Sequence, residues 1–396
     1  MGTENVYWGL PIVTYLFIIG ITAGSFIVGS LAKVFGIKQY EPLTKISLLV
    51  TLAFILFAPI GPLADAAQPE RWSELFLRPH IPASPLGLFT LIWGMYLIVV
   101  IIETYIVYRV PNIRFAQLHS GWRRTLYRVL SLVSTNRSDK SLQRDDLWSM
   151  ILSVIGLFLS LAFVSYDAFM LHSMKGHPLW ANPVIIPMFI TSAIVAGVAA
   201  VTIVYVFLNR YLSESRSVDL NIGDGLIRLL MWMLFADLLL DVVNMLGAIP
   251  HVYVGASIAD GWHIFLGGPL TWTYWLGQIG MLTLALVLTW FPRVRQSIKL
   301  ISLTSLIALF GVYMMRYNIV IGPQMQPKIS QGLISYAPVV FGAGSWQVVF
   351  GLFMLPLFVL AVLSMVLPWD DHIFSIRIAV ANEKRQPDQN NFRELT

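Results

Sequence analysis

Long apolar segments recur from one end of this 396-residue chain to the other, and each is long enough to cross a lipid bilayer. Lipid offers no hydrogen-bond partner for a free peptide group, so a spanning segment must satisfy its own backbone. Each segment is therefore predicted to be a helix, and the fold class is an all-α polytopic membrane protein. About nine spans are predicted, at residues 8–35, 43–63, 85–109, 147–171, 183–209, 224–248, 269–291, 301–320 and 339–367.

The 26 Lys and Arg residues divide unevenly between the gaps that separate these segments. Sixteen lie in one alternating set of gaps and four in the C-terminal tail, whereas the other set holds four and the spans hold two. Cytoplasmic loops carry the excess of basic residues, so the N-terminus is predicted outside and the C-terminus in the cytoplasm. The net charge of +5 then reflects topology and attraction to the lipid bilayer, and nucleic acid is not an expected partner.

The longest polar insertion, at residues 111–146, contains a basic stretch with aromatic residues, among them Trp122, Arg123, Arg124 and Tyr127. Such a stretch either lies along the inner membrane surface or forms a solvated cytoplasmic loop. The sequence leaves both readings open.

Missing residue types exclude most metal chemistry. Cysteine is absent, so the chain can hold no iron–sulfur cluster through thiolates. The seven histidines fall in predicted loops or at span ends, where no two form the axial pair that a membrane b-type haem needs. No P-loop, nucleophile elbow or zinc-ligand spacing occurs. No metal site is predicted in this chain, and the remaining options are transport and quinone chemistry.

Polar side chains gather at the outer ends of three predicted spans. Thr14 and Tyr15 lie in the outer half of the first span, Asp65 follows the second, and Tyr166 and Asp167 lie near the outer end of the fourth. Ionisable groups at membrane depth are costly and usually functional. The alternatives are that the tyrosines belong to an interfacial aromatic belt and that Asp65 forms an ion pair within its loop.

A second polar group lies in later spans. Asp237, Asp241 and Asn244 share one face of the sixth predicted helix, because their spacing is i, i+4 and i+7. Arg316 and Asn318 lie at the outer end of the eighth. We expect the arginine to pair with one of the carboxylates, either as a structural clamp or as part of a proton pathway.

Several short motifs follow one another in a familiar order. They are the small-residue stretch 20–25, Asp-Ala-Ala-Gln-Pro-Glu-Arg at 65–71, Ser-Pro at 84–85, Tyr166, His-Pro-Leu-Trp at 177–180 and Arg-Tyr-Asn-Ile-Val-Ile-Gly at 316–322. In this order they resemble the membrane subunits of the polysulfide-reductase family, of the NrfD and PsrC type. The length of the chain and its ninth span are similar to the larger members, such as the membrane subunits of menaquinone reductase or alternative complex III.

The resemblance implies two four-helix bundles, at residues 1–175 and 176–325, followed by an additional helix and a cytoplasmic tail at 326–396. It implies a quinone, menaquinone or ubiquinone, at the outer end of the first bundle. It also implies a ferredoxin-like iron–sulfur subunit on the outer face and a molybdopterin or multihaem cytochrome c subunit in the same complex. Ala67 replaces a glycine of the family's loop. The expected location is the cytoplasmic membrane of a prokaryote.

The function predicted from these observations is that of a haem-free, quinone-reactive membrane subunit of a respiratory oxidoreductase. A quinone needs an apolar slot, hydrogen bonds to its carbonyl oxygens and a proton donor or acceptor. Tyr15 and Tyr166 are predicted to give the hydrogen bonds, with Thr14 and Ala67 nearby, and Asp167 or Asp65 to exchange the proton. The alternatives are a proton-coupled secondary transporter, which favours a site near the midplane, and a purely structural membrane anchor.

Overall fold

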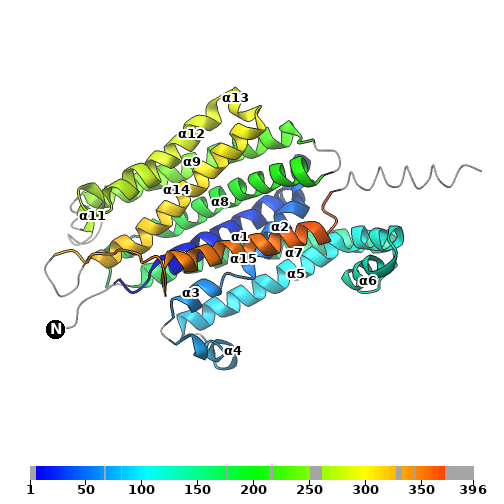
Figure 1. The fold of residues 1–396 in the computed structure, drawn as a ribbon, viewed down its shortest axis with the longest axis horizontal. Coiled ribbons are helices and arrows are strands. Elements are labelled where there is room, and N and C mark those ends of the chain that lie inside the picture. Colours follow the sequence, from blue (N-terminus) through cyan, green and yellow to red (C-terminus); the bar gives the residue numbers. More distant parts are fainter. Residues whose placement is uncertain are drawn as a thin grey trace, which may run out of the picture.

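The computed structural model describes residues 6–66, 68–81, 83–174, 176–213, 217–249, 261–326, 332–342 and 344–370. All regular secondary structure in these ranges is helical, and the long helices run roughly side by side (Figure 1). The long α-helices are α1 (Leu10–Val34), α2 (Leu43–Ile55), α5 (Pro85–Leu118), α7 (Asp139–Ser173), α8 (Ile185–Phe207), α9 (Leu220–Met245), α12 (Met281–Trp290), α14 (Ile298–Met325) and α15 (Trp346–Val366).

Shorter helices connect or continue these spans. The short α-helices are α3 (Ile60–Ala64), α4 (Glu74–Leu77), α6 (Gly121–Leu130), α11 (His263–Leu266) and α13 (Pro292–Arg295), and the 3₁₀-helices are η1 (Lys38–Tyr40), η2 (Pro69–Arg71), η3 (Pro178–Ala181) and η5 (Leu246–Ala248). Two segments are π-helical. The segment η4 (Leu208–Leu212) continues α8, and η6 (Thr273–Gly280) leads into α12.

The polytopic membrane fold predicted from the sequence is confirmed. Within the described ranges, eight helical segments are long and apolar enough to cross a bilayer. The helix α9 is 26 residues long and adds a ninth candidate, although it carries the charged residues Asp224, Arg228, Asp237 and Asp241. The location of the ends of these helices relative to a membrane stays a prediction.

Two predicted spans are longer in the structure than the apolar pattern indicated. The helix α5 continues past Arg109 to Leu118, and α7 begins at Asp139 instead of at residue 147. Arg109 pairs with Asp145 across these two helices, and its guanidinium also donates to Ser141 Oγ at 3.0 Å. Polar turns thus continue both helices beyond the apolar segments.

Two other spans begin or break at residues that resist helical geometry. The predicted span 339–367 begins only at Trp346, because Gly342 and Gly344 adopt left-handed backbone angles of φ +108° and +71°. The predicted span 43–63 is interrupted after Ile55 and resumes as α3, for which Pro59 is the N-cap residue. Proline lacks the N–H that would continue the preceding turn. The span predicted at 269–291 starts at Thr273 as a π-helical segment.

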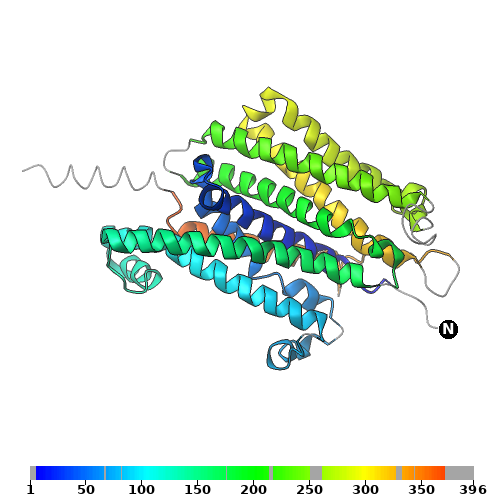
Figure 2. The same ribbon diagram turned by 180° about the vertical axis from the view of Figure 1, so that it is seen from behind.

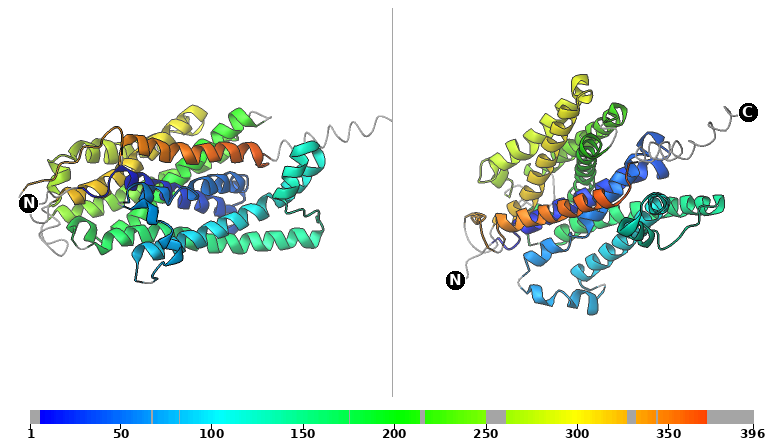
Figure 3. Two further views of the ribbon diagram at one scale, coloured as in Figure 1. Left: turned by 60° about the horizontal axis from the view of Figure 1, so that its bottom comes forward. Right: turned by 45° about the vertical axis from the view of Figure 1, so that its right-hand side comes forward.

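The helix α1 lies at the centre of the molecule and packs against α2, α7, α8, α14 and α15 (Figures 2 and 3). Further contacts join α5 to α7, α8 to α9 and α12 to α14, which accords with two groups of helices that meet along α1 and α8. The domain boundaries at residues 175 and 325 stay predictions.

The contact between α1 and α8 depends on two glycines. A Cβ atom on Gly24 would lie 2.9 Å from Gly197 Cα and would overlap the carbonyl group of Ala193, and a Cβ atom on Gly197 would overlap the backbone of Gly24. Small residues let two transmembrane backbones approach this closely. We call this contact the α1–α8 glycine seam.

Replacing Gly24 with alanine is expected to lower the stability of the protein by about 1–3 kcal/mol, the usual cost of overpacking. The added methyl group meets backbone atoms of α8, so no side-chain rotation relieves the overlap. The thermal unfolding temperature of the purified protein measures the effect. Gly94→Ala in α5 is the matched control, because nothing lies within 4 Å of its added Cβ. Equal unfolding temperatures for Gly24→Ala and the unsubstituted protein would contradict the seam.

Candidate functional site

A phenol and a carboxylate from two helices form a buried pair near the N-terminal end of α1. The Tyr15 hydroxyl donates a hydrogen bond of 2.8 Å to Oδ1 of Asp167, which α7 carries. Both side chains are almost fully buried, and Oδ2 of Asp167 has no hydrogen-bond partner among the described residues. The edge of the Phe89 ring packs against the Tyr15 ring, with the centroids 5.7 Å apart. A carboxylate held in this way can exchange a proton with a nearby group.

A mostly apolar cavity of about 330 Å³ lies beside this pair, between α2, α3, the segment 68–76 and α5. Phe89 lines the cavity and also contacts Tyr15, so one ring separates the cavity from the Tyr15–Asp167 pair. Its aromatic and polar lining includes Gln68, Arg71, Trp72, Phe76, Phe89, Thr90 and Trp93. Aromatic walls with a few polar groups suit a flat organic ligand.

The structure gives Asp65 a structural contact at the start of α1. Its Oδ2 accepts a hydrogen bond of 3.4 Å from the N–H of Gly9, while the Leu10 N–H donates to the Tyr336 hydroxyl at 3.1 Å. The side chain of Gln324 accepts from two further N–H groups of this end of the chain, those of residues 7 and 8. The first N–H groups of a helix lack partners within it, so Asp65 and Tyr336 complete the start of α1, and Gln324 holds the two residues before it.

Burial raises the pKa of the Asp65 carboxyl above its ordinary value, and the hydrogen bond from Gly9 acts in the opposite direction. An ion pair between Asp65 and Arg71 is not what the structure shows, because Arg71 donates to Gln68 Oε1 at 3.1 Å. Ala67, predicted to line the quinone site, lies outside the described residues.

Two other predicted residues have backbone partners. The Tyr166 hydroxyl donates to the carbonyl oxygen of Pro85 at 2.7 Å, and its ring lies at the partly exposed edge of α7. The Thr14 hydroxyl donates to the Leu10 carbonyl at 2.9 Å and lies 3.2 Å from the Tyr313 hydroxyl. Direct contact of Tyr166 or Thr14 with a ligand therefore stays a prediction.

Arg316 lies in the interior of the protein, where its side chain is fully buried. Its Nη2 donates to Ser192 Oγ at 2.7 Å and to the Phe189 carbonyl at 3.3 Å, and the guanidinium lies 3.7 Å from the centre of the Phe189 ring. The carboxylates whose charges act on it are Asp237 of α9 and Asp167 of α7. Its Nε and Nη1 have no hydrogen-bond partner in the described part of the chain.

The two carboxylates of α9 have separate partners. Asp237 accepts a hydrogen bond of 2.7 Å from the Thr191 hydroxyl, and Asp241 accepts one of 2.8 Å from Gln278 Nε2. In neither case does the second carboxylate oxygen have a partner among the described residues. The predicted pairing of Arg316 with one of these carboxylates is not what the structure shows, because no ion pair joins them in the described ranges and Arg316 donates to Ser192 and to the Phe189 carbonyl instead.

The amide of Asn318 extends this network. It donates to Gln278 Oε1 at 2.9 Å and accepts from the Thr273 hydroxyl at 2.8 Å. Asn244 is separate from it and accepts a hydrogen bond of 2.6 Å from Asn182. The structure thus links Asp241 and Asn318 through Gln278. It gives Asp237, Arg316 and Asn244 separate hydrogen-bond partners.

Three contributors were not predicted from the sequence. Gln278 bridges Asp241 and Asn318, Ser192 binds Arg316, and Phe89 forms the wall between the cavity and Tyr15. Gln278 was detectable, because it is the one amide inside the predicted span 269–291. A serine and a phenylalanine within apolar helices carry no such signal.

Aromatic rings lie next to the Tyr15–Asp167 pair, on the side away from the start of α1. Phe89 stacks on Phe163 at 5.4 Å between centroids, and Tyr96 contacts both Phe163 and Phe26. Glu103 lies further along α5, where it accepts a hydrogen bond from Ser153. This aromatic layer separates Glu103 from Asp167. Groups of three or more side chains able to hold a metal ion do not occur in the described ranges.

The chain is similar to a known family and to several characterised relatives. The family model described as "Polysulphide reductase, NrfD" matches residues 2–328. A selenate reductase subunit of Mesobacillus selenatarsenatis is 24% identical over 335 residues, which cover 82% of this chain and 76% of the relative. A putative dimethyl sulfoxide reductase membrane subunit of Halobacterium salinarum is 26% identical, over 78% of this chain and 68% of the relative. The Hdr-like menaquinol oxidoreductase integral membrane subunit of Archaeoglobus fulgidus is 21% identical, over 88% and 82%.

Proposed function

Because the chain belongs to the polysulphide reductase NrfD family and is a membrane subunit of an oxidoreductase complex, we propose that it binds a quinone and exchanges electrons with it through partner subunits. The observation that carries the proposal is the cavity of about 330 Å³ beside the Tyr15–Asp167 pair. One relative is named as a menaquinol oxidoreductase subunit, which supports a quinone as the substrate class. Menaquinone and ubiquinone both fit this class.

The proposed chemistry divides between this chain and its partners. The ring of the quinone lies in the cavity against Trp72, Phe76 and Phe89, where flat aromatic groups stack favourably. Reduction requires two electrons and two protons. Asp167 exchanges one proton with the quinone when the Phe89 ring moves aside, while the Tyr15 hydroxyl holds its carboxylate in place, and the second proton is exchanged with water at the exposed side of the cavity. Electrons come from a partner, because this chain contains no cysteine for an iron–sulfur cluster.

The proposed partner subunits are those that the family resemblance implies. A ferredoxin-like iron–sulfur subunit lies on the outer face, near the cavity, and joins the chain to a molybdopterin or multihaem cytochrome c subunit. Selenate and dimethyl sulfoxide reductases are named among the relatives, so the complex acts on a soluble oxidant or reductant of that kind. The proposed location is the cytoplasmic membrane of a prokaryote.

We also propose that Arg316, Asp237 and Asp241 take part in proton transfer that accompanies quinone chemistry. The positive charge of Arg316 acts on Asp167 of α7 and on Asp237 of α9. A cavity of about 40 Å³, lined by Gln278 and Asn318, has room for a few water molecules beside this network. A proton-coupled transporter is the second candidate and uses the same three groups, but it leaves the Tyr15–Asp167 pair and its neighbouring cavity without a role.

Filling the cavity tests the proposed function. Thr90→Phe adds bulk to the α5 wall of the cavity, so the KM of the purified complex for quinone is expected to rise at least about tenfold, equivalent to about 1.4 kcal/mol of binding. The assembled complex should keep its activity toward its soluble substrate with an artificial electron carrier. Ile101→Phe, on an exposed part of α5, is the matched control. An unchanged KM in Thr90→Phe would remove the cavity from the proposal.

The proposed orientation makes a separate prediction. A reporter that is active only in the cytoplasm, fused after Arg123, is expected to be active, and one fused at the N-terminus is expected to be inactive, because basic loops stay on the inner side. Activity at the N-terminus and not after Arg123 would invert the topology. The Tyr15–Asp167 pair would then face the cytoplasm.

A further inference from the structure

The helix α6 and the turn after it form a basic and apolar surface that quinone chemistry does not use. Residues 121–134, which we call the α6 unit, lie at the opposite end of the molecule from the N-terminal end of α1 (Figure 1). The unit folds back beside the last turns of α5, where the Tyr127 ring packs at 5.3 Å from that of Phe115. The sequence left open whether this stretch lies on the membrane or in solvent.

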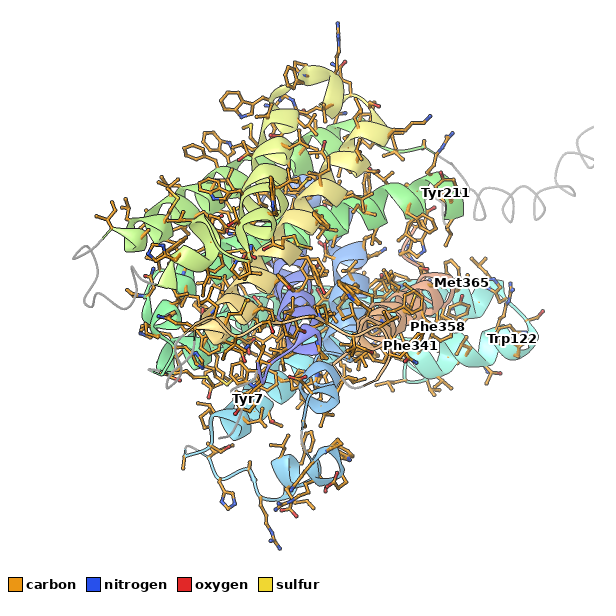
Figure 4. The ribbon with its side chains drawn as sticks, turned by 60° about the vertical axis from the view of Figure 1, so that its left-hand side comes forward. Tyr7, Trp122, Tyr211, Phe341, Phe358 and Met365 are labelled. Atoms are coloured by element: carbon orange, nitrogen blue, oxygen red, sulfur yellow. The ribbon has the colours of Figure 1, made fainter. Side chains whose placement is uncertain are left out.

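The helix α6 presents three different flanks. Leu126, Tyr127 and Leu130 face the protein and are buried or partly buried. Trp122 and Val129 share a second flank, and both are exposed, Trp122 to 71% (Figure 4). The third flank holds the exposed pair Arg124 and Arg128, spaced i and i+4. The exposed surface thus combines apolar side chains with unpaired positive charge, since neither Arg124 nor Arg128 forms an ion pair with a described residue.

The turn after α6 exposes two more apolar side chains at an energetic cost. Leu132 and Val133 have φ angles of +48° and +59°. Residues other than glycine rarely adopt this left-handed region, and a β-branched residue such as Val133 least of all. The Val133 N–H donates to the Arg128 carbonyl at 2.8 Å, which fixes this geometry. Their side chains are nevertheless 71% and 73% exposed. Exposure of these side chains to water adds to the cost of the left-handed angles, whereas their transfer to an apolar environment lowers the free energy.

Arg109 fixes the height of this turn along α5. Its guanidinium donates to Ser134 Oγ at 3.3 Å and to the Asn136 carbonyl at 3.0 Å, and it pairs with Asp145 of α7. Arg109 lies nine residues before Leu118, so the chain has returned by roughly 13 Å from the tip of α5 when it reaches residue 134. This is the level at which the third apolar span ends.

We propose that the α6 unit binds the membrane surface, with Val129, Leu132 and Val133 among the lipid headgroups and Arg124 and Arg128 on the phosphates of anionic lipids. The occupant is anionic lipid because unpaired arginines and exposed apolar groups lie together at the end of a spanning segment. The centre of the Trp122 ring lies 5.6 Å from the guanidinium carbon of Arg123. Tryptophan is enriched at membrane–water interfaces. The Arg109 contacts hold the unit in this position before lipid binds.

The absence of cysteine makes a direct test simple, because any introduced cysteine is the single labelling site. An environment-sensitive fluorophore on Leu132→Cys in the full-length protein, reconstituted in phosphatidylcholine mixed with phosphatidylglycerol, is expected to be quenched by lipids that carry a doxyl group near the headgroup. The same fluorophore on Leu118→Cys, at the tip of α5, is the matched control and should be quenched by a water-soluble reagent instead. In pure phosphatidylcholine, doxyl quenching at position 132 should fall.

Charge variants show whether the arginines are responsible. Arg124→Gln combined with Arg128→Gln is expected to reduce the ratio of membrane-bound to free α6 unit by about twentyfivefold, at about fivefold for each arginine. Arg293→Gln combined with Lys299→Gln removes the same charge from exposed residues elsewhere and should leave quenching at position 132 unchanged. Aqueous quenching at position 132 in both lipids, or equal doxyl quenching in both, would overturn the proposal. Protection at position 132 that requires the partner subunits would also overturn it, in favour of a protein interface.

Discussion

Asp167→Asn is expected to slow quinone-dependent turnover of the assembled complex by about 100- to 10,000-fold, the usual contribution of a general acid or base. Asparagine keeps the shape of the side chain and still accepts the hydrogen bond of 2.8 Å from the Tyr15 hydroxyl. It cannot take up or release a proton in the relevant range. Quinone reduction or quinol oxidation by the purified complex, measured spectrophotometrically, checks the result.

Two tyrosine variants serve as controls for this experiment. Tyr15→Phe removes the hydrogen bond to Asp167 and is expected to slow turnover less, because the carboxylate remains. Tyr166→Phe removes a bond to the Pro85 carbonyl and should have the smallest effect of the three, unless Tyr166 itself contacts the quinone as the sequence predicts. Full activity of an assembled Asp167→Asn complex would remove Asp167 from the mechanism.

Arg316→Gln is expected to destabilise the protein by about 3–5 kcal/mol, a cost typical of leaving a buried charge without its partner. The substitution leaves Asp237 and Asp167, both buried, without the cation whose charge acts on both. The yield of assembled protein and its thermal unfolding temperature measure the loss. Arg316→Lys keeps the charge and should recover part of the stability, although it cannot reproduce the planar contact with the Phe189 ring.

Double-mutant cycles locate the partner of Arg316. The structure predicts strong coupling between Arg316→Gln and Asp237→Asn, because the double variant removes one positive charge together with one of the two negative charges on which it acts. Coupling with Asp241→Asn should be weaker, since Gln278 is the hydrogen-bond partner of Asp241. Stronger coupling to Asp241 than to Asp237 would contradict this arrangement.

The apolar pattern was sufficient to predict the number and type of the long helices, because a membrane imposes one solution on a polar backbone. It could not predict their ends. The extension of α5 to Leu118 depends on the contacts of Arg109 with α7 and the following loop, which join residues distant in sequence. The late start of α15 depends on left-handed angles at Gly342 and Gly344, which composition does not reveal.

Sequence reasoning identified several of the buried polar residues but not their contacts, and it missed others such as Gln278. A charged residue inside an apolar segment is recognisable from the sequence alone, so Asp167, Asp237 and Arg316 could be predicted as candidate residues. Which of them meet depends on how the helices are rotated and staggered, and this is set by small residues such as Gly24. The contact of Asp65 with the start of α1 could not be predicted either, because its partner is the backbone N–H of Gly9, which any residue at that position would offer.

The α1–α8 glycine seam has a consequence for the time course of turnover. The backbones of α1 and α8 cannot separate without losing this close contact, so the seam opposes any rocking of α1 against α8. Rocking of domains takes microseconds to milliseconds, whereas rotation of side chains takes picoseconds to nanoseconds. Without such rocking, a proton that moves between Asp167 and Asp237 past the fixed charge of Arg316 depends on side-chain and water movements alone. On the proposed function, the exchange of quinone and the supply of electrons then set the rate of the complex.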